Sequence, residues 1–287
     1  MWIALAAAYG LLKGIRDVIK KVALKKSSTI EVLFFYTLLS FVFVLPWSGE
    51  AVAMLSGGSS GYLALIALKS FVIYIAWICS FKAIEHLPIG FYGLMDMSRV
   101  IITSLLSLLI LGEAMSFEKA IGMVLVLDGL LMVNMSKAVQ GGGSGGIPVK
   151  YTLLVLVSCC MNSCSEIFDK WFMRPETGIT TGQLQFWYMF FLTAMYFIHI
   201  LIRRIKLDWT MLWKNYWIPI LAVLFVIGDK CLFIANQTGD VIPMTLLKQC
   251  AVMVTILGGK VVFKEKHILF KLLCAVVIIC GILIGVK

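Results

Sequence analysis

Long apolar segments separated by short polar connections recur along the whole chain. Such a segment needs roughly 20 helical residues to cross a hydrocarbon core of about 30 Å. Ten segments reach or approach this length: 2–21, 30–47, 62–84, 88–111, 117–136, 150–172, 182–202, 216–236, 241–263 and 267–286. Connections such as EHLP and TGDVIP leave room only for a tight turn, so their flanking helices are expected to be antiparallel neighbours. The pattern predicts an all-α integral membrane protein with ten transmembrane helices.

The two halves of the chain repeat one another. A shift of 152 residues aligns polar positions without gaps: Asp17 with Asp169, Thr103 with Thr255, Glu113 with Glu265 and Lys119 with Lys271. Five helices per copy is an odd number, so the second copy enters the membrane from the opposite side. We therefore expect two inverted five-helix repeats, 1–136 and 150–287, around a central cavity, an arrangement typical of secondary transporters. A Gly/Ser-rich linker over 137–149 is expected to be a flexible tether.

Composition narrows the function. The chain is 61% apolar, whereas a soluble domain is roughly half apolar. Its net charge of +10 is explained by basic loops that set membrane orientation, and we expect no nucleic-acid partner. The eight cysteines lack zinc-type spacing and are expected to be free thiols, so we expect no metal and no cofactor. The chain contains no Walker motif and no catalytic pair in a loop, which argues against an enzyme and against a built-in ATPase.

Three stretches resemble a known family. These are LGEAMSFEKAIGMVLVLDGLLMV (111–133), FKEKHILFKLLCAVVIICGILIGV (263–286) and SEIFDKWFM (165–173). In each of the first two, a Glu closes one helix and a short turn leads to a Gly-containing final helix. The chain resembles the drug/metabolite transporter superfamily, in its ten-helix EamA-type branch. The resemblance implies a basket of helices whose cavity is lined by the first, third and fourth helix of each copy, with the second and fifth more peripheral.

Ionisable residues inside membrane helices are candidates for function, because burying them is costly. Asp96 and Arg99 share a helix face in LMDMSRV, and the 152-residue shift places Lys248 opposite Asp96 but Ala251 opposite Arg99. Two interpretations stay open: Asp96 pairs with Arg99 or Lys248 as a structural lock, or the three charges bind substrate. Lys69, Lys82 and Lys170 lie near helix ends, where long side chains reach the interface. The predicted substrate-binding residues are Asp96, Arg99, Lys248, Gln249, Asp229, Lys230, Tyr92, Trp77 and Asn236, and the predicted ion-coupling residues are Asp17 and Asp169.

These observations predict a secondary transporter that moves a small polar metabolite, amino-acid-like, zwitterionic or anionic, by alternating access. Transport is expected to be facilitative or driven by a proton or sodium gradient. One alternative is a carrier of quaternary amines or cationic drugs with an aromatic cage, and another is a flippase for lipid head groups. We expect a monomer or weak dimer in the cytoplasmic (inner) membrane of a bacterium. Basic residues after the first and seventh helices and around the turn between the ninth and tenth predict that both termini lie outside.

Overall fold

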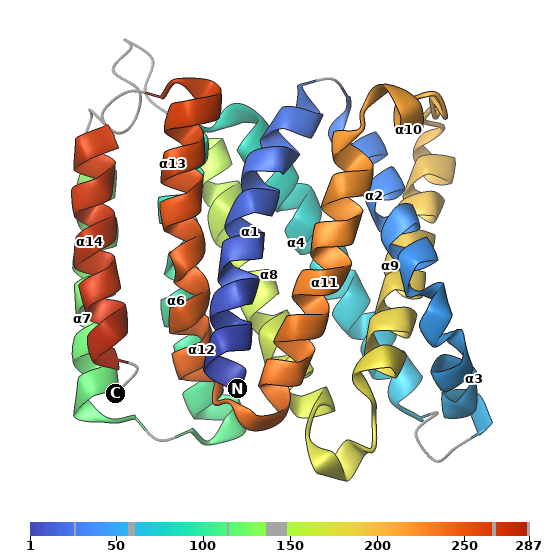
Figure 1. Cartoon of the computed structure of the whole chain (residues 1–287), viewed down its shortest axis with the longest axis horizontal. Coiled ribbons are helices and arrows are strands. Elements are labelled where there is room, and N and C mark those ends of the chain that lie inside the picture. The colour runs from blue at the N-terminus through green and yellow to red at the C-terminus, as the bar shows by residue number, and fades with distance from the viewer. Residues whose placement is uncertain (26, 57–60, 114, 136–147, 266–267, 286–287) are drawn as a thin grey trace.

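A computed structural model describes residues 1–25, 27–56, 61–113, 115–135, 148–265 and 268–285. All regular secondary structure in these ranges is helical, with no strand (Figure 1). The all-α class predicted from the sequence is therefore confirmed. The predicted linker, apart from its last two residues, lies outside the described residues.

Every apolar segment expected from the sequence contains helix, and several are subdivided. The first half contains α1 (Trp2–Leu24), α2 (Thr29–Val44), η1 (Leu45–Trp47), α3 (Ser48–Ser56), α4 (Leu63–His86), α5 (Ile89–Asp96), α6 (Ser98–Leu106), the π-helical turn η3 (Ser107–Leu111) and α7 (Phe117–Met135). The second half contains α8 (Val149–Phe172), η4 (Pro175–Thr177), α9 (Thr181–Arg203), α10 (Met211–Lys214), α11 (Trp217–Thr238), α12 (Val241–Leu247), η5 (Lys248–Cys250), α13 (Ala251–Phe263) and α14 (Ile268–Gly285).

Seven helical segments of the described chain are long and apolar enough to cross a membrane. They are 29–55, 63–86, 89–111, 149–172, 181–203, 217–238 and 241–263. The chain is therefore a multi-pass membrane protein. Ten spanning helices stay a prediction, because α1, α7 and α14 are not among these seven segments.

The first helix, α1, turns its charges inward. Four charged residues recur at helical spacing on one face and are all buried: Lys13, Arg16, Asp17 and Lys20. The apolar residues Leu11 and Ile15 of the same helix are exposed on the outside of the bundle. This arrangement reverses the pattern of a surface helix in a soluble protein. In a membrane protein, such an arrangement is expected when the polar side chains of a helix face an internal site and its apolar side chains face the lipid.

Equivalent helices of the two halves make equivalent contacts. Helix α1 packs on α11 and α13, and its counterpart α8 packs on α4 and α6. Helices α2 and α9 pack on each other. Helices α7 and α14 also pack on each other and stand side by side at the left edge of the bundle in Figure 1. The helix starts are also alike, since Ser28 caps α2 through the Glu31 N–H and Thr180 caps α9 through the Gln183 N–H. Each of these contacts maps onto another when the halves are exchanged. The division into two inverted repeats stays a prediction.

The halves are also joined by two reciprocal helix caps. The carboxylate of Glu265 accepts the backbone N–H groups of Ile89 (2.5 Å) and Gly90 (3.2 Å), which open α5. The carboxylate of Glu113 accepts those of Val241 (2.8 Å) and Ile242 (3.2 Å), which open α12. The 152-residue shift relates each residue of one cap to a residue of the other: Glu113 to Glu265, Ile89 to Val241 and Gly90 to Ile242. Each cap satisfies N–H groups that have no partner within their own helix.

The two ends of the bundle differ in charge. The first residue and the end of α14 lie at one end, and the connections after α1, after α9 and between α13 and α14 lie at the other (Figure 1). The basic residues of these three connections include Lys25, Arg204, Lys206 and Lys264. The structure thus brings the basic connections identified in the sequence to a single face.

Candidate functional site

The fourth helix of each half is interrupted at its charged residue. The sequence predicted one continuous helix over 88–111 and another over 241–263. Instead, α5 ends at Asp96 and α6 starts at Ser98, whereas α12 is followed by a 3₁₀ turn that begins at Lys248. Neither site contains Gly or Pro, so local sequence gave no sign of a break. Discontinuous helices are a common feature of substrate sites in transporters.

Five charged side chains form a continuous series at these interruptions, which we call the charge chain: Lys13, Asp96, Arg99, Glu166 and Lys248. The ammonium group of Lys13 contacts the Asp96 carboxylate. Arg99 lies 3.5 Å from both Asp96 and Glu166, and Lys248 Nζ lies 3.0 Å from Glu166 Oε1. The charge chain thus connects α1, the two interrupted helices and α8.

This geometry revises the expected pairing. In the described chain Lys248 pairs with Glu166 and not with Asp96, and Arg99 bridges the two carboxylates. The Thr103 and Thr245 hydroxyls donate further hydrogen bonds to Glu166 at 3.1 and 3.3 Å. Glu166 was not among the predicted site residues, and its mirror position in the first half is Gly14. A multiply bonded series of this kind matches the structural lock better than a free binding surface.

Beside the charge chain lies a central cavity of about 60 Å³. Its charged lining residues are Lys13, Arg16, Asp17, Lys20, Lys69, Arg99, Glu166, Asp169 and Asp229. A water molecule needs about 10–15 Å³ of volume measured in this way. The cavity therefore has room for only a few waters, and a metabolite would enter only when the helices move apart.

The remaining cavity charges form three ion pairs of unequal quality. Lys20 lies 2.8 Å from Asp17, and Lys69 lies 2.9 Å from Asp169. Arg16 lies 3.7 Å from Asp229, beyond hydrogen-bond distance. The expectation that Lys69 reaches the membrane interface is wrong, because its side chain is buried against Asp169 and the Tyr188 ring. Lys82, in contrast, is exposed, as expected.

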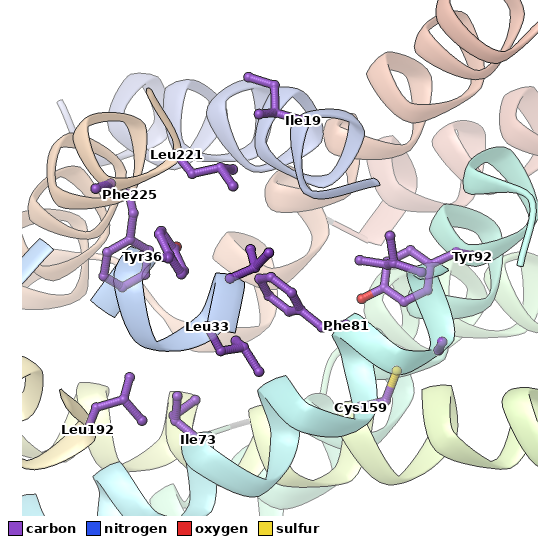
Figure 2. Close-up of a cluster of buried hydrophobic side chains, with 14 of the residues drawn as sticks. Ile19, Leu33, Tyr36, Ile73, Phe81, Tyr92, Cys159, Leu192, Leu221 and Phe225 are labelled. Atoms are coloured by element: carbon purple, nitrogen blue, oxygen red, sulfur yellow. The ribbon is translucent and has the colours of Figure 1, made fainter. Parts of the chain in front are cut away.

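Aromatic side chains also line the cavity: Tyr9, Tyr36, Trp77, Tyr92, Tyr188 and Phe225. Tyr36 from α2 lies against Phe225 from α11 (Figure 2), with ring centroids 5.4 Å apart. Tyr36 and Tyr188 occupy mirror positions on the second helices, so these helices are less peripheral than the family resemblance implied. Cations already lie over the rings: Arg16 is 5.0 Å from the Phe225 centroid and Lys69 is 3.6 Å from that of Tyr188.

Not all predicted site residues reach the cavity. Asp17, Trp77, Tyr92, Arg99, Asp169 and Asp229 line it, and Asp96 and Lys248 join it through the charge chain. Lys230 lies 3.9 Å from the Trp47 ring centroid, because a helix turns its next residue by about 100° away from Asp229. Gln249 donates to the Thr245 carbonyl, and the Asn236 backbone carbonyl accepts from Lys170. These three residues are thereby placed outside the cavity wall. Arg16 and Lys69 also line it, although neither was among the predicted substrate-binding or ion-coupling residues.

Comparisons with known proteins agree with this architecture. Residues 1–135 match the model of the EamA-like transporter family. The match confirms the resemblance to drug/metabolite transporters and indicates a membrane transporter of that type, a class distinct from enzymes. A solved structure, titled only as the crystal structure of a protein, has a TM-score of 0.69 and 14% identity, covering 97% of this chain and 94% of the other. At this identity the likeness concerns the fold alone. No curated protein matches the chain.

Proposed function

We propose that this transporter moves a small polar metabolite, amino-acid-like, zwitterionic or anionic, by alternating access through the central cavity. The observation that supports the proposal most is the density of buried charge. Within the described chain, eleven charged side chains are at least nine-tenths buried in the cavity wall and the charge chain. Charge inside a bilayer is expensive and is usually retained for a substrate or ion pathway.

The arrangement of the halves favours alternating access. The cavity lies between α1, α4, α8 and α11, which make matching contacts across the two repeats. Opening of the cavity to one side of the membrane and then to the other requires two alternative helix packings of similar energy. An inverted repeat provides them, because its two halves can exchange conformations. The caps by Glu113 and Glu265 lie at opposite ends of the bundle, so opening at one end leaves the other cap intact.

The aromatic wall argues against a cage for quaternary amines. Such a cage needs open ring faces that can receive the ligand cation. Here the faces of Phe225 and Tyr188 are already covered by Arg16 and Lys69. A second cation would have to displace these groups against like-charge repulsion.

Energy coupling is proposed to use a proton or sodium ion at Asp17 and Asp169. These carboxylates occupy mirror positions, both line the cavity, and each is paired with a lysine. Both termini are proposed to lie outside, since the basic connections gather at one face. The proposed location is the cytoplasmic membrane of a bacterium.

A thermal-shift screen of the purified protein tests the substrate class. A ligand that binds only the folded state raises the unfolding temperature by mass action. The proposal predicts stabilisation by amino acids or small acids and none by choline. Stabilisation by quaternary amines alone would overturn it in favour of the aromatic cage. Stabilisation by short-chain phospholipids alone would favour the flippase.

A further inference from the structure

Three hydrogen-bond donors in the lining of the cavity lack acceptors among the described residues. Arg16 is 4% exposed and Tyr36 is 1% exposed, so bulk water does not solvate either side chain. Within the part of the chain that the structure describes, the Arg16 Nε and Nη1 groups and the Tyr36 hydroxyl have no hydrogen-bond partner. A buried donor without an acceptor costs about 1–3 kcal/mol, and more if it is charged. A cavity wall that retains three such donors is suited to a ligand that brings acceptors.

The three donors belong to the lining of the same small cavity. Arg16 and Tyr36 both line it and both lie against the same ring, with the Arg16 Cζ 5.0 Å and the Tyr36 ring 5.4 Å from the Phe225 centroid. Figure 2 shows the side chains of Tyr36 and Phe225 beside one another. A ligand in the cavity would therefore lie next to both Arg16 and Tyr36.

Charge balance identifies the kind of acceptor. Among the eleven buried charges of the described cavity and charge chain, six are cations and five are carboxylates. The cations are Lys13, Arg16, Lys20, Lys69, Arg99 and Lys248, and the carboxylates are Asp17, Asp96, Glu166, Asp169 and Asp229. The wall thus has an excess of one positive charge in a medium where an unbalanced charge is costly.

The excess charge is best assigned to Arg16. The lysines Lys20, Lys69 and Lys248 each lie within 3.0 Å of a carboxylate, and Lys13 contacts Asp96. Arg99 donates hydrogen bonds to two carboxylates. Among the residues that the structure describes, Arg16 has only the long ion pair with Asp229, at 3.7 Å, so its guanidinium is the least neutralised.

We infer that Arg16 and Tyr36 form the subsite for an oxyanion, a carboxylate or phosphate group, on the transported solute. The inference rests on the proposed function and narrows it from any small polar metabolite to one with a net negative charge. Arg16 supplies charge-assisted donors, which are about twice as strong as neutral ones. Tyr36 supplies a third donor, and the Phe225 ring fixes the position of both.

Binding to the full-length protein in detergent tests the subsite. The probes are acetate, lactate, inorganic phosphate, a short-chain phosphatidic acid, glycine and choline, measured by calorimetry. We expect an oxyanion to bind, and Arg16→Lys and Tyr36→Phe each to weaken it at least about tenfold. Tyr196→Phe, a buried tyrosine that bonds to the Tyr74 carbonyl, and Arg203→Lys, on the surface, should bind within twofold of the wild type.

The conservative variants separate binding from folding. The Tyr36 hydroxyl has no hydrogen-bond partner among the described residues, so Tyr36→Phe should unfold at a temperature no lower than the wild type when no ligand is present. Arg16→Lys keeps a cation near Asp229. Wild-type affinity for the oxyanion in both variants would overturn the inference. So would binding of glycine or choline without binding of any oxyanion.

The subsite and the transport function can fail separately. Uptake of a neutral or cationic solute into proteoliposomes, unaffected by Arg16→Lys, would overturn the subsite and leave the transporter intact. Oxyanion binding that depends on Arg16 without uptake of the same anion would support the subsite and contradict transport. Arg16-dependent binding of phosphatidic acid alone would support an oxyanion subsite but make the ligand a lipid head group.

Discussion

Glu113 and Glu265, 152 residues apart, each cap a helix of the other half of the molecule. Glu113 accepts the first N–H groups of α12, and Glu265 accepts those of α5. A carboxylate at a helix N-terminus gains both from these hydrogen bonds and from the helix dipole. The two caps therefore hold the interrupted helices that supply Asp96 and Lys248 to the charge chain.

Removing either cap should loosen the junction between the halves. Glu113→Gln and Glu265→Gln each lose the charge assistance of two hydrogen bonds, and we expect each to lower the free energy of unfolding by about 1–3 kcal/mol. Thermal unfolding in detergent measures the effect. Glu176→Gln is the control, since Glu176 is exposed and should change stability by at most about 0.5 kcal/mol. Unchanged melting of both cap variants would contradict the assigned role.

The charge chain is predicted to be a lock. Asp96→Asn leaves Lys13 facing a neutral amide in a buried site, which should destabilise the protein by about 3–5 kcal/mol. The double variant Lys13→Gln, Asp96→Asn removes both charges and leaves Arg99 beside Glu166, so it should lose less stability than the sum of the losses of Lys13→Gln and Asp96→Asn. Additive losses would show that the two side chains do not act as a pair.

Single and double variants of the Lys69–Asp169 pair distinguish an effect on stability from an effect on transport. Either Lys69→Met or Asp169→Leu alone strands a buried charge and should cost about 3–5 kcal/mol. The double variant replaces the pair by apolar groups, which is often neutral or stabilising. We expect it to fold like the wild type but to lose solute uptake, because the pair lines the cavity. Normal uptake by the double variant would exclude Asp169 as an ion-coupling residue.

Alanine substitutions at two glycines are expected to affect the stability of the protein differently. A Cβ at Gly10 would lie 2.9 Å from the Lys248 carbonyl oxygen, so Gly10→Ala should push α1 away from η5 and cost about 1–3 kcal/mol. Gly49 in α3 has open space around its Cβ position. Gly49→Ala should be neutral or stabilise the protein through helix propensity. The comparison of the two unfolding temperatures checks this prediction, and a Gly10→Ala protein that melts with the wild type would contradict it.

The sequence predicted the fold in outline because a bilayer enforces it. Segment lengths, the helical class and the correspondence of Glu113 with Glu265 follow from apolar runs and spacing, which are local or periodic properties. The pairing of the buried charges does not. Glu166 meets Lys248, and Arg16 meets Asp229, through contacts between distant helices whose rotation the sequence leaves open. The environment of Lys69 was predicted wrongly because the distance of a residue from a helix end does not determine which face of the helix its side chain occupies.

Counterflow in proteoliposomes tests the central claim most directly. Vesicles are loaded with one small oxyanion-bearing solute at high concentration, and uptake of the same labelled solute is followed without ATP. Alternating access through the charged cavity predicts transient accumulation of label above equilibrium, which disappears in the Lys69→Met, Asp169→Leu double variant. The account would be contradicted if no solute of this class accumulated to a higher level than in protein-free vesicles. It would also be contradicted if the double variant showed the same counterflow as the wild type.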